Sequence, residues 1–375
     1  IILCGFVAGC DQQNSASGPI KVGEYGSMTG SQATFGVSTD NGIKLAVKER
    51  NAAGGVLGRQ IKIIPYDDAG KSQEAITAVT RLIQQDHVVA VLGEVASSLS
   101  IAGGQVAQRQ GVPMISPSST NPQVTKIGDM IFRVCFIDPF QGYVGAKFAH
   151  DNLKLTTAAT LYNRAQAYSA GLNEEFVKNF KQLGGEVLIQ QAYSDGDNDF
   201  SAQLTAIREK HPQFIYIPGY YTEVVTIAKQ ARKLGITCPM IGGDGWVSDE
   251  LKNAGSALDG CYFSDHYAKE DKRPEVQTFL AKYKAAYGSA PDSMAALGYD
   301  AANLLFYAMT RAKSLSGTYL AAAIAATKDF KAVTGSITIN KNRDADKIAV
   351  IQKLEGGVFS YYTTIQPPKS ATSAP

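Results

Sequence analysis

The sequence is poor in the residues that several common functions require. Its 375 residues include five cysteines, four histidines and one tryptophan, and no CxxC pair occurs. Because a zinc site needs a cluster of cysteine and histidine ligands, we expect no metal site and no cofactor. The net charge is only +2 and no long run of Lys and Arg is present, so the composition argues against nucleic-acid binding.

Signatures of catalysis are also missing. The chain contains neither GxSxG nor GxxxxGK[ST]. A nucleophilic serine needs a base, usually a histidine, and no histidine lies in a strand-end loop beside the serines discussed below. The four histidines are His87, His150, His211 and His266. We therefore expect a protein that is not an enzyme, and a hydrolase using Ser97, Ser118 or Ser119 is the alternative.

The N-terminus carries the only strongly apolar run outside the body of the chain. "IILCGFVAGC" is shorter than the roughly 20 residues of a membrane span, and no other stretch is apolar enough over that length. "VAGC" resembles the bacterial lipobox, in which residues 1–9 are removed and Cys10 is acylated. A polar tether follows, so we predict a body anchored to a membrane only by lipid. Asp11 directly after this cysteine implies retention at the inner membrane; a buried first strand with a chance cysteine is the alternative.

From Ile20 onward, short β-branched runs alternate with longer amphipathic stretches. This alternation predicts an α/β fold with parallel sheets covered by helices on both faces. At this length two domains are the default. The candidate strands are residues 20–26, 61–68, 88–94, 112–117, 158–163, 214–220 and 239–245, with later strands in 333–340 and 347–362. The candidate helices are residues 38–55, 72–85, 222–235, 273–288 and 294–315.

Polar and aromatic side chains follow the predicted strands, where open α/β sheets bind ligands. The early strands end in hydroxyl residues that precede helices, and such groups favour an anion: Ser97, Ser98, Ser118, Ser119 and Thr120. The later strands end in an acid and aromatic rings, which suit an ammonium group and an apolar side chain: Tyr168, Tyr220, Tyr221, Asp244 and Trp246. Together the two sets predict a site for a zwitterionic α-amino acid. Each residue taken alone has a structural alternative as a turn cap, helix cap or core residue.

The cysteines that follow Cys10 permit one disulfide in an exported protein. Cys238 precedes the apolar run "PMIGG" and Cys261 opens "CYFSD", and neighbouring parallel strands at these runs would place both cysteines near the same sheet edge. We predict a disulfide between them, although the sequence leaves their oxidation open. Cys135 is expected to be a buried free thiol.

Several motifs together resemble the leucine/isoleucine/valine-binding protein family, the extracytoplasmic substrate-binding proteins of ABC importers. The motifs are "GSMTG" with the following "FG", "NAAGGVLGRQIKIIPYDD", "GEVASSLS", "ISPSSTNP", "YIPGYYTE", "IGGDGW" and "ALGYDAANLL". The resemblance covers residues 19–366 and implies the type I periplasmic-binding-protein fold, in which ligand closes a cleft between two lobes. The implied lobes are residues 19–138 plus 267–342 and residues 139–266 plus 343–366. The hinge crossings are expected near Ile137–Pro139, Asp265–Tyr267 and Asn342–Lys347, and residues 367–375 form a disordered tail.

The resemblance also implies roles for individual residues. Ser97 and the backbone at Ser118 and Thr120 would hold the ligand α-carboxylate and share in binding its ammonium. Asp244 would pair with the ammonium, although it is an aspartate where the branched-chain binder has a glutamate.

Aromatic residues would form the remainder of the implied site. Tyr220 matches a cleft tyrosine, and Tyr168 and Phe35 match positions that flank the side-chain pocket. Phe35 replaces a tyrosine, and Trp246 brings bulk beside the pocket. Glu94 and Asp138 lie near the expected cleft or hinge without an assigned role.

The resemblance implies a free amino acid as ligand, aliphatic or branched-chain, and ABC permease subunits as partners. The implied location is periplasmic or extracytoplasmic, at the membrane through the lipid on Cys10. A sensing receptor domain of the same fold, for amino acids or amides, is the second alternative.

Overall fold

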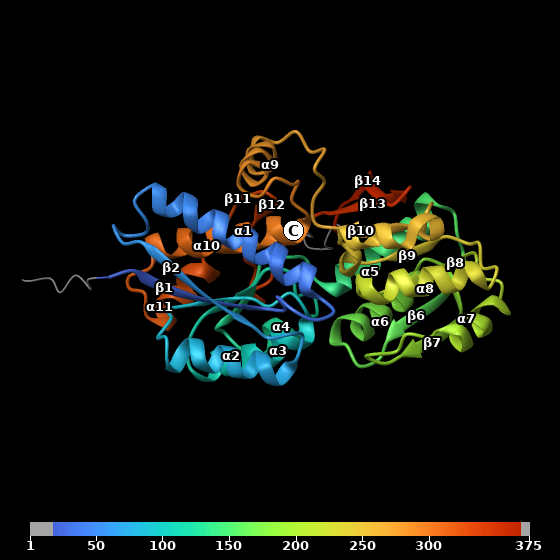
Figure 1. The fold of residues 1–375 in the computed structure, drawn as a ribbon, viewed down its shortest axis with the longest axis horizontal. Helices are drawn as coiled ribbons and strands as arrows, with labels where there is room; N and C mark the ends of the chain where they lie inside the picture. The colour runs from blue at the N-terminus through green and yellow to red at the C-terminus, as the bar shows by residue number, and fades with distance from the viewer. Residues whose placement is uncertain (1–17, 369–375) are drawn as a thin grey trace, which may run out of the picture.

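The computed structural model describes residues 18–368. Two α/β units lie side by side, each built on its own sheet (Figure 1). We call the unit around the five-stranded sheet the first lobe and the unit around the seven-stranded sheet the second lobe. The predicted α/β class is confirmed. The predictions for Cys10, Asp11 and residues 369–375 lie outside the described residues.

The sheet of the first lobe is parallel throughout, in the order β2-β1-β3-β4-β5. Its strands are β1 (Ile20–Gly26), β2 (Ile61–Asp67), β3 (Val91–Leu92), β4 (Met114–Ser116) and β5 (Ile131–Arg133). The central strands are buried on both faces, as their uninterrupted apolar sequence requires. The chain reverses its direction of travel through the sheet between β1 and β3, so the loops after these strands flank a crevice.

Helices cover both faces of this sheet. The helix α1 (Ala33–Ala52) packs along α10 (Ser293–Arg311), and α2 (Ser72–Gln84) packs against α3 (Ser97–Arg109) (Figure 1). The smaller elements of the first lobe are α4 (Gln123–Lys126), α9 (Pro274–Tyr287), α11 (Gly317–Ala325), β11 (Phe330–Ala332) and β12 (Gly335–Ile337). The α1 helix begins earlier than predicted because Gly36 lets it touch the preceding loop. A Cβ at Gly36 would lie 2.2 Å from the Ser27 carbonyl oxygen.

The sheet of the second lobe has the order β14-β13-β10-β9-β8-β6-β7. Its parallel strands are β6 (Thr157–Asn163), β7 (Glu186–Tyr193), β8 (Phe214–Ile217), β9 (Met240–Gly242) and β10 (Tyr262–Asp265). A hairpin of β13 (Ala349–Glu355) and β14 (Val358–Ile365) adds to β10 in antiparallel orientation. The strand β7 was absent from the predicted set because it is a half-buried edge strand without a continuous apolar run.

The second lobe is likewise enclosed by helices. On one side α5 (Asp138–Lys147) packs against α6 (Ala167–Gln182), and a π-helical turn η1 (Phe148–Asn152) continues α5. A separate group of helices consists of α7 (Ser201–Arg208), α8 (Tyr221–Lys233), the short 3₁₀ helix η2 (Asp244–Trp246) and the 3₁₀ helix η3 (Asp249–Leu258). None of the helices in residues 18–368 is long and apolar enough to cross a bilayer.

The chain passes between the two sheets after β5, after β10 and between β12 and β13. The third crossing falls later than the predicted boundary at residues 342/343. Arg343 donates from its guanidinium to the Thr125 carbonyl (2.8 Å), and Asp344 pairs with Arg133 (2.7 Å). Both residues are therefore bound to the first lobe, and the crossing follows them.

All three cysteines in the described part of the chain are free thiols, so the predicted Cys238–Cys261 disulfide is not formed in the structure. The Cys261 sulfur instead accepts from the Met240 backbone N–H (3.3 Å), and burial raises the pKa of this thiol to about 11. Cys135 is buried and free, as expected.

Candidate ligand-binding site

A small cavity lies between the lobes where strand ends from both sheets meet. Its volume is about 10 Å³, which is room for about one water molecule. It is lined by Phe35, Val95, Ser97, Ser118, Tyr168, Tyr220, Asp244, Gly245 and Met294. Six of the eight predicted ligand residues are in this set, and Thr120 and Trp246 are the two that are not.

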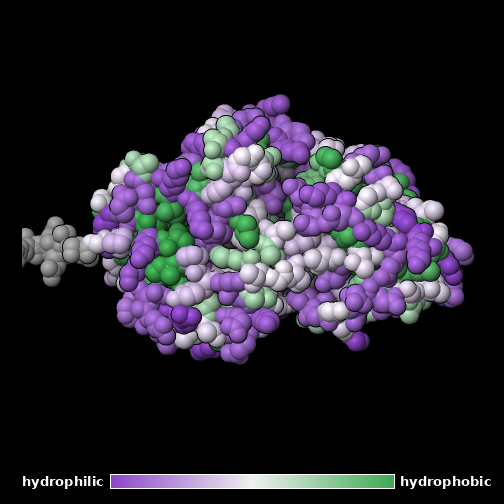
Figure 2. All heavy atoms as spheres, in the orientation of Figure 1, coloured by the Kyte–Doolittle hydropathy of each residue, from purple (hydrophilic) through white to green (hydrophobic). Residues whose placement is uncertain are grey.

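The lobes are in contact around this cavity. The Tyr221 hydroxyl in the second lobe donates to the Ser31 carbonyl in the first (2.9 Å). On another side Asn121 donates its amide N–H to the Ala167 carbonyl (2.7 Å). Figure 2 shows the lobes meeting on the visible face, which is mostly hydrophilic with apolar residues in small groups. The arrangement is therefore closed, and a ligand larger than a water molecule can enter only when the lobes part.

The three hydroxyl residues after β4 divide into two kinds. Ser119 Oγ is used inside the first lobe, within hydrogen-bond distance of the Glu94 carbonyl (3.0 Å) and the Val95 carbonyl (2.9 Å). In contrast, Ser118 Oγ and Thr120 Oγ1 are buried and have no hydrogen-bond partner among the described residues. Since a buried hydroxyl left unpaired is costly and only Ser118 of the two lines the cavity, Ser118 is the hydroxyl of the turn that can still bind a ligand.

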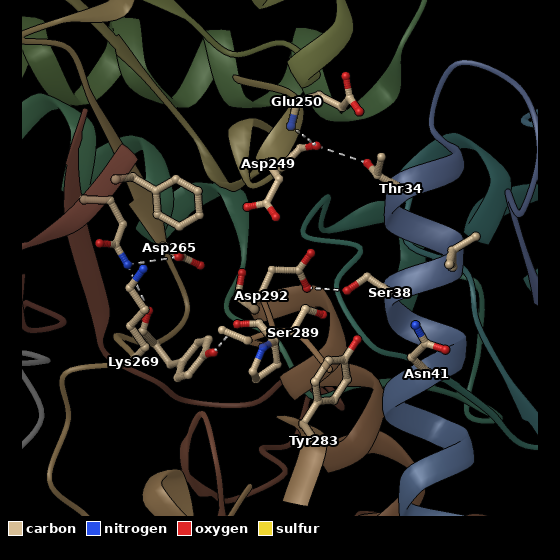
Figure 3. A pocket seen from close by; sticks show the side chains of 18 residues that line it. Thr34, Ser38, Asn41, Asp249, Glu250, Asp265, Lys269, Tyr283, Ser289 and Asp292 are labelled. Atoms are coloured by element: carbon tan, nitrogen blue, oxygen red, sulfur yellow. Dashed lines mark hydrogen bonds between the residues drawn. The ribbon is translucent and has the colours of Figure 1, made fainter. Parts of the chain in front are cut away.

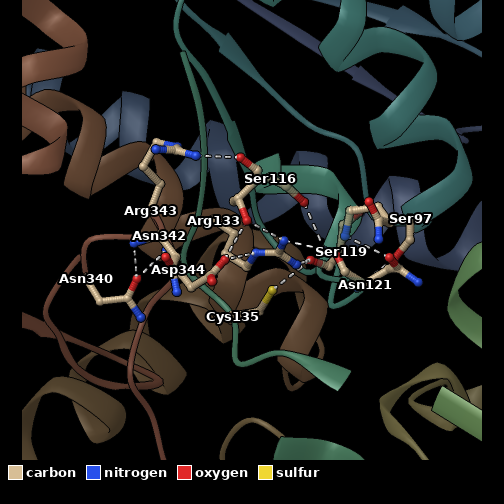
Figure 4. Close-up of polar contacts among 12 residues, drawn as sticks. Ser97, Ser116, Ser119, Asn121, Arg133, Cys135, Asn340, Asn342, Arg343 and Asp344 are labelled. Atoms are coloured by element: carbon tan, nitrogen blue, oxygen red, sulfur yellow. Dashed lines mark hydrogen bonds and ion pairs between the residues drawn. The ribbon is translucent and has the colours of Figure 1, made fainter. Parts of the chain in front are cut away.

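A buried ion pair holds this turn in place. The Arg133 side chain is 0% exposed, and its Nε lies 2.7 Å from Asp344 Oδ1 (Figure 4). One guanidinium nitrogen donates to the Ser119 carbonyl and the other to the Asn121 carbonyl (2.9 Å). The backbone on both sides of Thr120 is therefore fixed from within the first lobe.

Ser97 is the first residue of α3 and faces the same cavity. Its Oγ accepts from the Asn121 backbone N–H (3.2 Å), so its own O–H remains to be donated. The N-terminus of this 13-residue helix adds a positive partial charge suited to a carboxylate.

Glu94, which the sequence left without a role, supports this half of the site. Its carboxylate accepts from the Ser27 backbone N–H (3.0 Å) and from the Ala96 N–H. Burial raises the pKa of Glu94 well above its usual range. It does not line the cavity, so its function is to hold the loops after β1 and β3 together.

Asp244 provides the acid on the second lobe. Its carboxylate is held by Gln141 Nε2 on Oδ1 (2.7 Å) and by His266 Nε2 on Oδ2 (2.9 Å). The side chain is only 4% exposed. Neither Gln141 nor His266 was selected from the sequence, because both reach Asp244 from distant segments, and no local pattern signals the contact.

Aromatic and apolar side chains form the remaining wall. Tyr168 and Tyr220 stack with their ring centroids 5.1 Å apart, and Phe35 meets Tyr220 edge-on at 5.9 Å. Val95 and Met294 complete the wall. Val95 lies in the loop after β3, so the strand-end rule could have selected it. Met294 comes from the start of α10, and only helix packing brings it here.

The structure does not place Trp246 in the cavity, so its predicted position beside the pocket is wrong. The indole is 0% exposed inside the second lobe and donates to the Ile217 carbonyl (2.9 Å). It lies over Gly242, where a Cβ would come within 2.1 Å of the ring. The glycine before the turn is therefore what lets the indole fold inward.

A larger cavity of about 340 Å³ lies beside this site, also between the lobes (Figure 3). Asp249, Asp265 and Asp292 are among its lining residues, and burial raises the pKa of Asp265 to about 6. None of the predicted ligand residues lines it. The smaller cavity is therefore the candidate site, because it joins the hydroxyls of Ser97 and Ser118 to an acid on the opposite lobe.

Comparisons with known proteins agree with this geometry. The chain matches the family described as "Periplasmic binding protein" over residues 19–357. It is 30% identical over 368 residues to Leu/Ile/Val-binding protein homolog 2 of Brucella abortus (strain 2308), which covers 96% of this chain and 97% of that protein.

Two solved structures are similar over nearly their whole length. The leucine-binding protein LivK from Thermotoga maritima superposes with a TM-score of 0.89 at 37% identity, covering 93% of this chain and 99% of that chain. LivJ from Streptococcus pneumoniae, solved in complex with isoleucine, superposes with a TM-score of 0.88 at 32% identity, covering 93% and 100%.

The fold and the interlobe cavity define a two-lobed solute-binding protein, and the family match assigns the same class. The chain belongs to the type I periplasmic binding protein family, where its relatives include the Leu/Ile/Val-binding proteins. The resemblance stated from the motifs is confirmed. These relatives are binding proteins rather than enzymes, and within residues 18–368 no histidine is hydrogen-bonded to Ser97, Ser118 or Ser119.

Proposed function

We propose that this protein is an extracytoplasmic solute-binding lipoprotein that binds a free α-amino acid with an aliphatic side chain. Closure of the two lobes captures the amino acid, and the loaded protein delivers it to the permease of an ABC importer. The names of its relatives support this ligand class, since they include a Leu/Ile/Val-binding protein homolog and a LivJ complex with isoleucine.

One observation carries the proposal: groups for both ends of a zwitterion face a single cavity from opposite lobes. Ser97 and Ser118 supply hydroxyl donors for a carboxylate, and Asp244 supplies an acid for an ammonium group. A hydrogen bond to a charged group contributes about 1.5–3 kcal/mol. Three such bonds with apolar burial are compatible with about −8 kcal/mol, the micromolar range.

The rest of the wall supports an apolar ligand side chain. Phe35, Val95 and Met294 present carbon atoms, and the rings of Tyr168 and Tyr220 add to them. Opening must break lobe contacts such as the Tyr221–Ser31 hydrogen bond. A ligand that bridges the lobes favours the closed state by its differential affinity for it.

The test is thermal unfolding of the purified protein with each of the twenty amino acids and with small amides. A ligand at a hundredfold excess over its Kd should add about 2.7 kcal/mol of stability. We expect stabilisation by leucine, isoleucine or valine. The matched controls are 3-methylbutylamine and 4-methylpentanoate, which keep the leucine side chain but lack one charged end. Stabilisation by either control as strong as by leucine, or by no amino acid, would contradict the proposal.

The lipid anchor is tested separately. A Cys10→Ser variant expressed with the full leader should lose acylation and appear in the soluble extracytoplasmic fraction. Membrane association that persists in this variant would argue against an anchor at Cys10.

A further inference from the structure

The acid of the site is held by residues that belong to the connections between the lobes. Gln141 lies in the first turns of α5, the helix that follows the first crossing. His266 is the residue directly after β10, where the second crossing begins. Both partners of the Asp244 carboxylate are thus close to the points about which the lobes must rotate.

His266 also contacts the first crossing. Its ring stacks on Phe136, in the segment between β5 and α5, with centroids 3.9 Å apart and an interplanar angle of 21°. Its neighbour Asp265 accepts from Gln352 Nε2 of β13 (3.2 Å). The first and second crossings therefore meet at the buried His266 ring, and that ring is bonded to Asp244.

We infer that His266 is a positioning residue that couples Asp244 to lobe opening. This rests on the proposed function, in which Asp244 binds the ligand ammonium. An ionised carboxylate only accepts hydrogen bonds, so His266 Nε2 must be the donor. Gln141 is carried by a helix of the second lobe and moves with Asp244. His266 lies on the crossing itself, so rotation of the lobes changes its position relative to Asp244. The ligand therefore binds best when closure brings His266 Nε2 within hydrogen-bond distance of Asp244.

Two substitutions separate this role from simple packing. His266→Phe keeps an aromatic ring for the stack on Phe136 but removes the donor. His266→Gln keeps an N–H that can reach Asp244 but removes the ring. We expect isothermal titration calorimetry with leucine to show a loss of about tenfold or more for His266→Phe, since about 1.4 kcal/mol of the bond to a charged group corresponds to tenfold. His266→Gln should retain affinity within about threefold of wild type.

A residue that acts only through packing would give the opposite order, because phenylalanine preserves the ring and glutamine does not. Wild-type affinity in His266→Phe would therefore overturn the inference. If the wild-type protein itself binds no amino acid, the proposed function fails and the inference fails with it. If wild type binds and both variants bind equally well, only the inference fails.

The coupling to the hinge has its own measurement. Phe136→Leu removes the stacked ring, and Phe136 does not line the ligand cavity. We expect it to weaken leucine binding and to reduce the ligand-induced fall in radius of gyration measured by X-ray scattering, with Tm as a check on folding. Unchanged affinity and an unchanged fall in radius would overturn the link to the crossings.

Discussion

The two halves of the candidate site are held in place by different means. On the first lobe, the hydroxyl turn is fixed by Arg133, whose partners Ser119, Asn121 and Asp344 are all bound within that lobe (Figure 4). On the second lobe, Asp244 depends on Gln141, which a helix of that lobe carries, and on His266, which lies at the second crossing. Both halves are buried and hydrogen-bonded, but only the second is held by a residue that lies on a crossing.

This difference shows how one half of such a site can be fixed in place while the other half changes position as the lobes open and close. The hydroxyl half is preorganised, so binding a carboxylate there requires little ordering. The acid half is adjusted by the hinge, so binding an ammonium there is linked to lobe position. Five predictions test the comparison, in order of decreasing expected effect.

Arg133→Met should cause the largest loss, because it leaves Asp344 as a buried charge without its partner. Breaking a buried ion pair typically costs about 3–5 kcal/mol. Urea unfolding monitored by circular dichroism measures the change. The double variant Arg133→Met with Asp344→Leu removes both charges and should recover part of the stability; equal stability of Arg133→Met and wild type would refute the role of the network.

Asp244→Asn should reduce leucine affinity by about a hundredfold, or about 3 kcal/mol, because the ammonium loses its charged partner. Stability should change little, since the amide oxygen of asparagine can still accept a hydrogen bond from Gln141 or His266. Calorimetry measures the affinity. The matched control is Asp249→Asn, an exposed acid that lines the larger cavity but not the ligand cavity. An equal loss of leucine affinity in both variants would mean that the effect comes from the change in net charge rather than from a contact between Asp244 and the ligand.

Asp265→Asn tests the buried charge at the second crossing. Burial raises the pKa of Asp265 to about 6, so the folded state favours the protonated form. The contribution of Asp265 to the free energy of unfolding is therefore most favourable at low pH and is lost as the pH rises through about 6. The substitution should raise stability by about 2 kcal/mol at pH 7 and by little at pH 4. Urea unfolding across this range measures it, and equal gains at both pH values would contradict the prediction.

The hydroxyl turn offers a pair of changes with opposite expected readouts. Ser118→Ala removes a buried hydroxyl that lines the cavity and has no partner within the described chain. It should weaken leucine binding by about 1 kcal/mol without loss of stability. Ser119→Ala removes hydroxyl contacts to the Glu94 and Val95 carbonyls, so it should lower stability by about 1–2 kcal/mol. Calorimetry measures leucine affinity and urea unfolding measures stability in both variants. A larger loss of affinity in Ser119→Ala than in Ser118→Ala would contradict the assignment of Ser119 to the scaffold and Ser118 to the ligand.

Trp246→Phe should have the smallest effect on binding, since the indole lies in the second-lobe core and not in the cavity. Affinity within about twofold of wild type is expected, with a stability loss of about 1 kcal/mol from the missing bond to Ile217. A change in the order of preference among leucine, isoleucine and valine would instead show that Trp246 shapes the pocket.

Much of the fold was predictable because its signals are local. The apolar runs of β1, β6 and β8 and the capped amphipathic patterns of α2 and α8 appear at the expected residues. The elements that were missed or shifted depend on distant contacts. The early start of α1 requires its approach to the Ser27 loop, and the edge strand β7 is defined by pairing with β6.

The site divides in the same way. Ser97, Ser118, Tyr168, Tyr220 and Asp244 follow strands, so the strand-end rule selected them. Trp246 follows the same strand as Asp244, but a glycine beneath it turns the indole into the core. Cys238 and Cys261 are close in the sheet order, yet the Cys261 sulfur is bonded to Met240 rather than to Cys238.

The sequence by itself determined the α/β class, the family and the set of strand-end groups that a zwitterion requires, because these depend on local patterns. Only the tertiary structure decided which of those groups remain free to bind a ligand and which are used in hydrogen bonds within the protein. Ser119 is used by the scaffold while Ser118 is not, and Asp244 is held by Gln141 of α5 and by His266 at the second crossing. The physical reason is that hydrogen-bond partners are shared among segments far apart in the chain, and no spacing in the sequence records which donor reaches which acceptor.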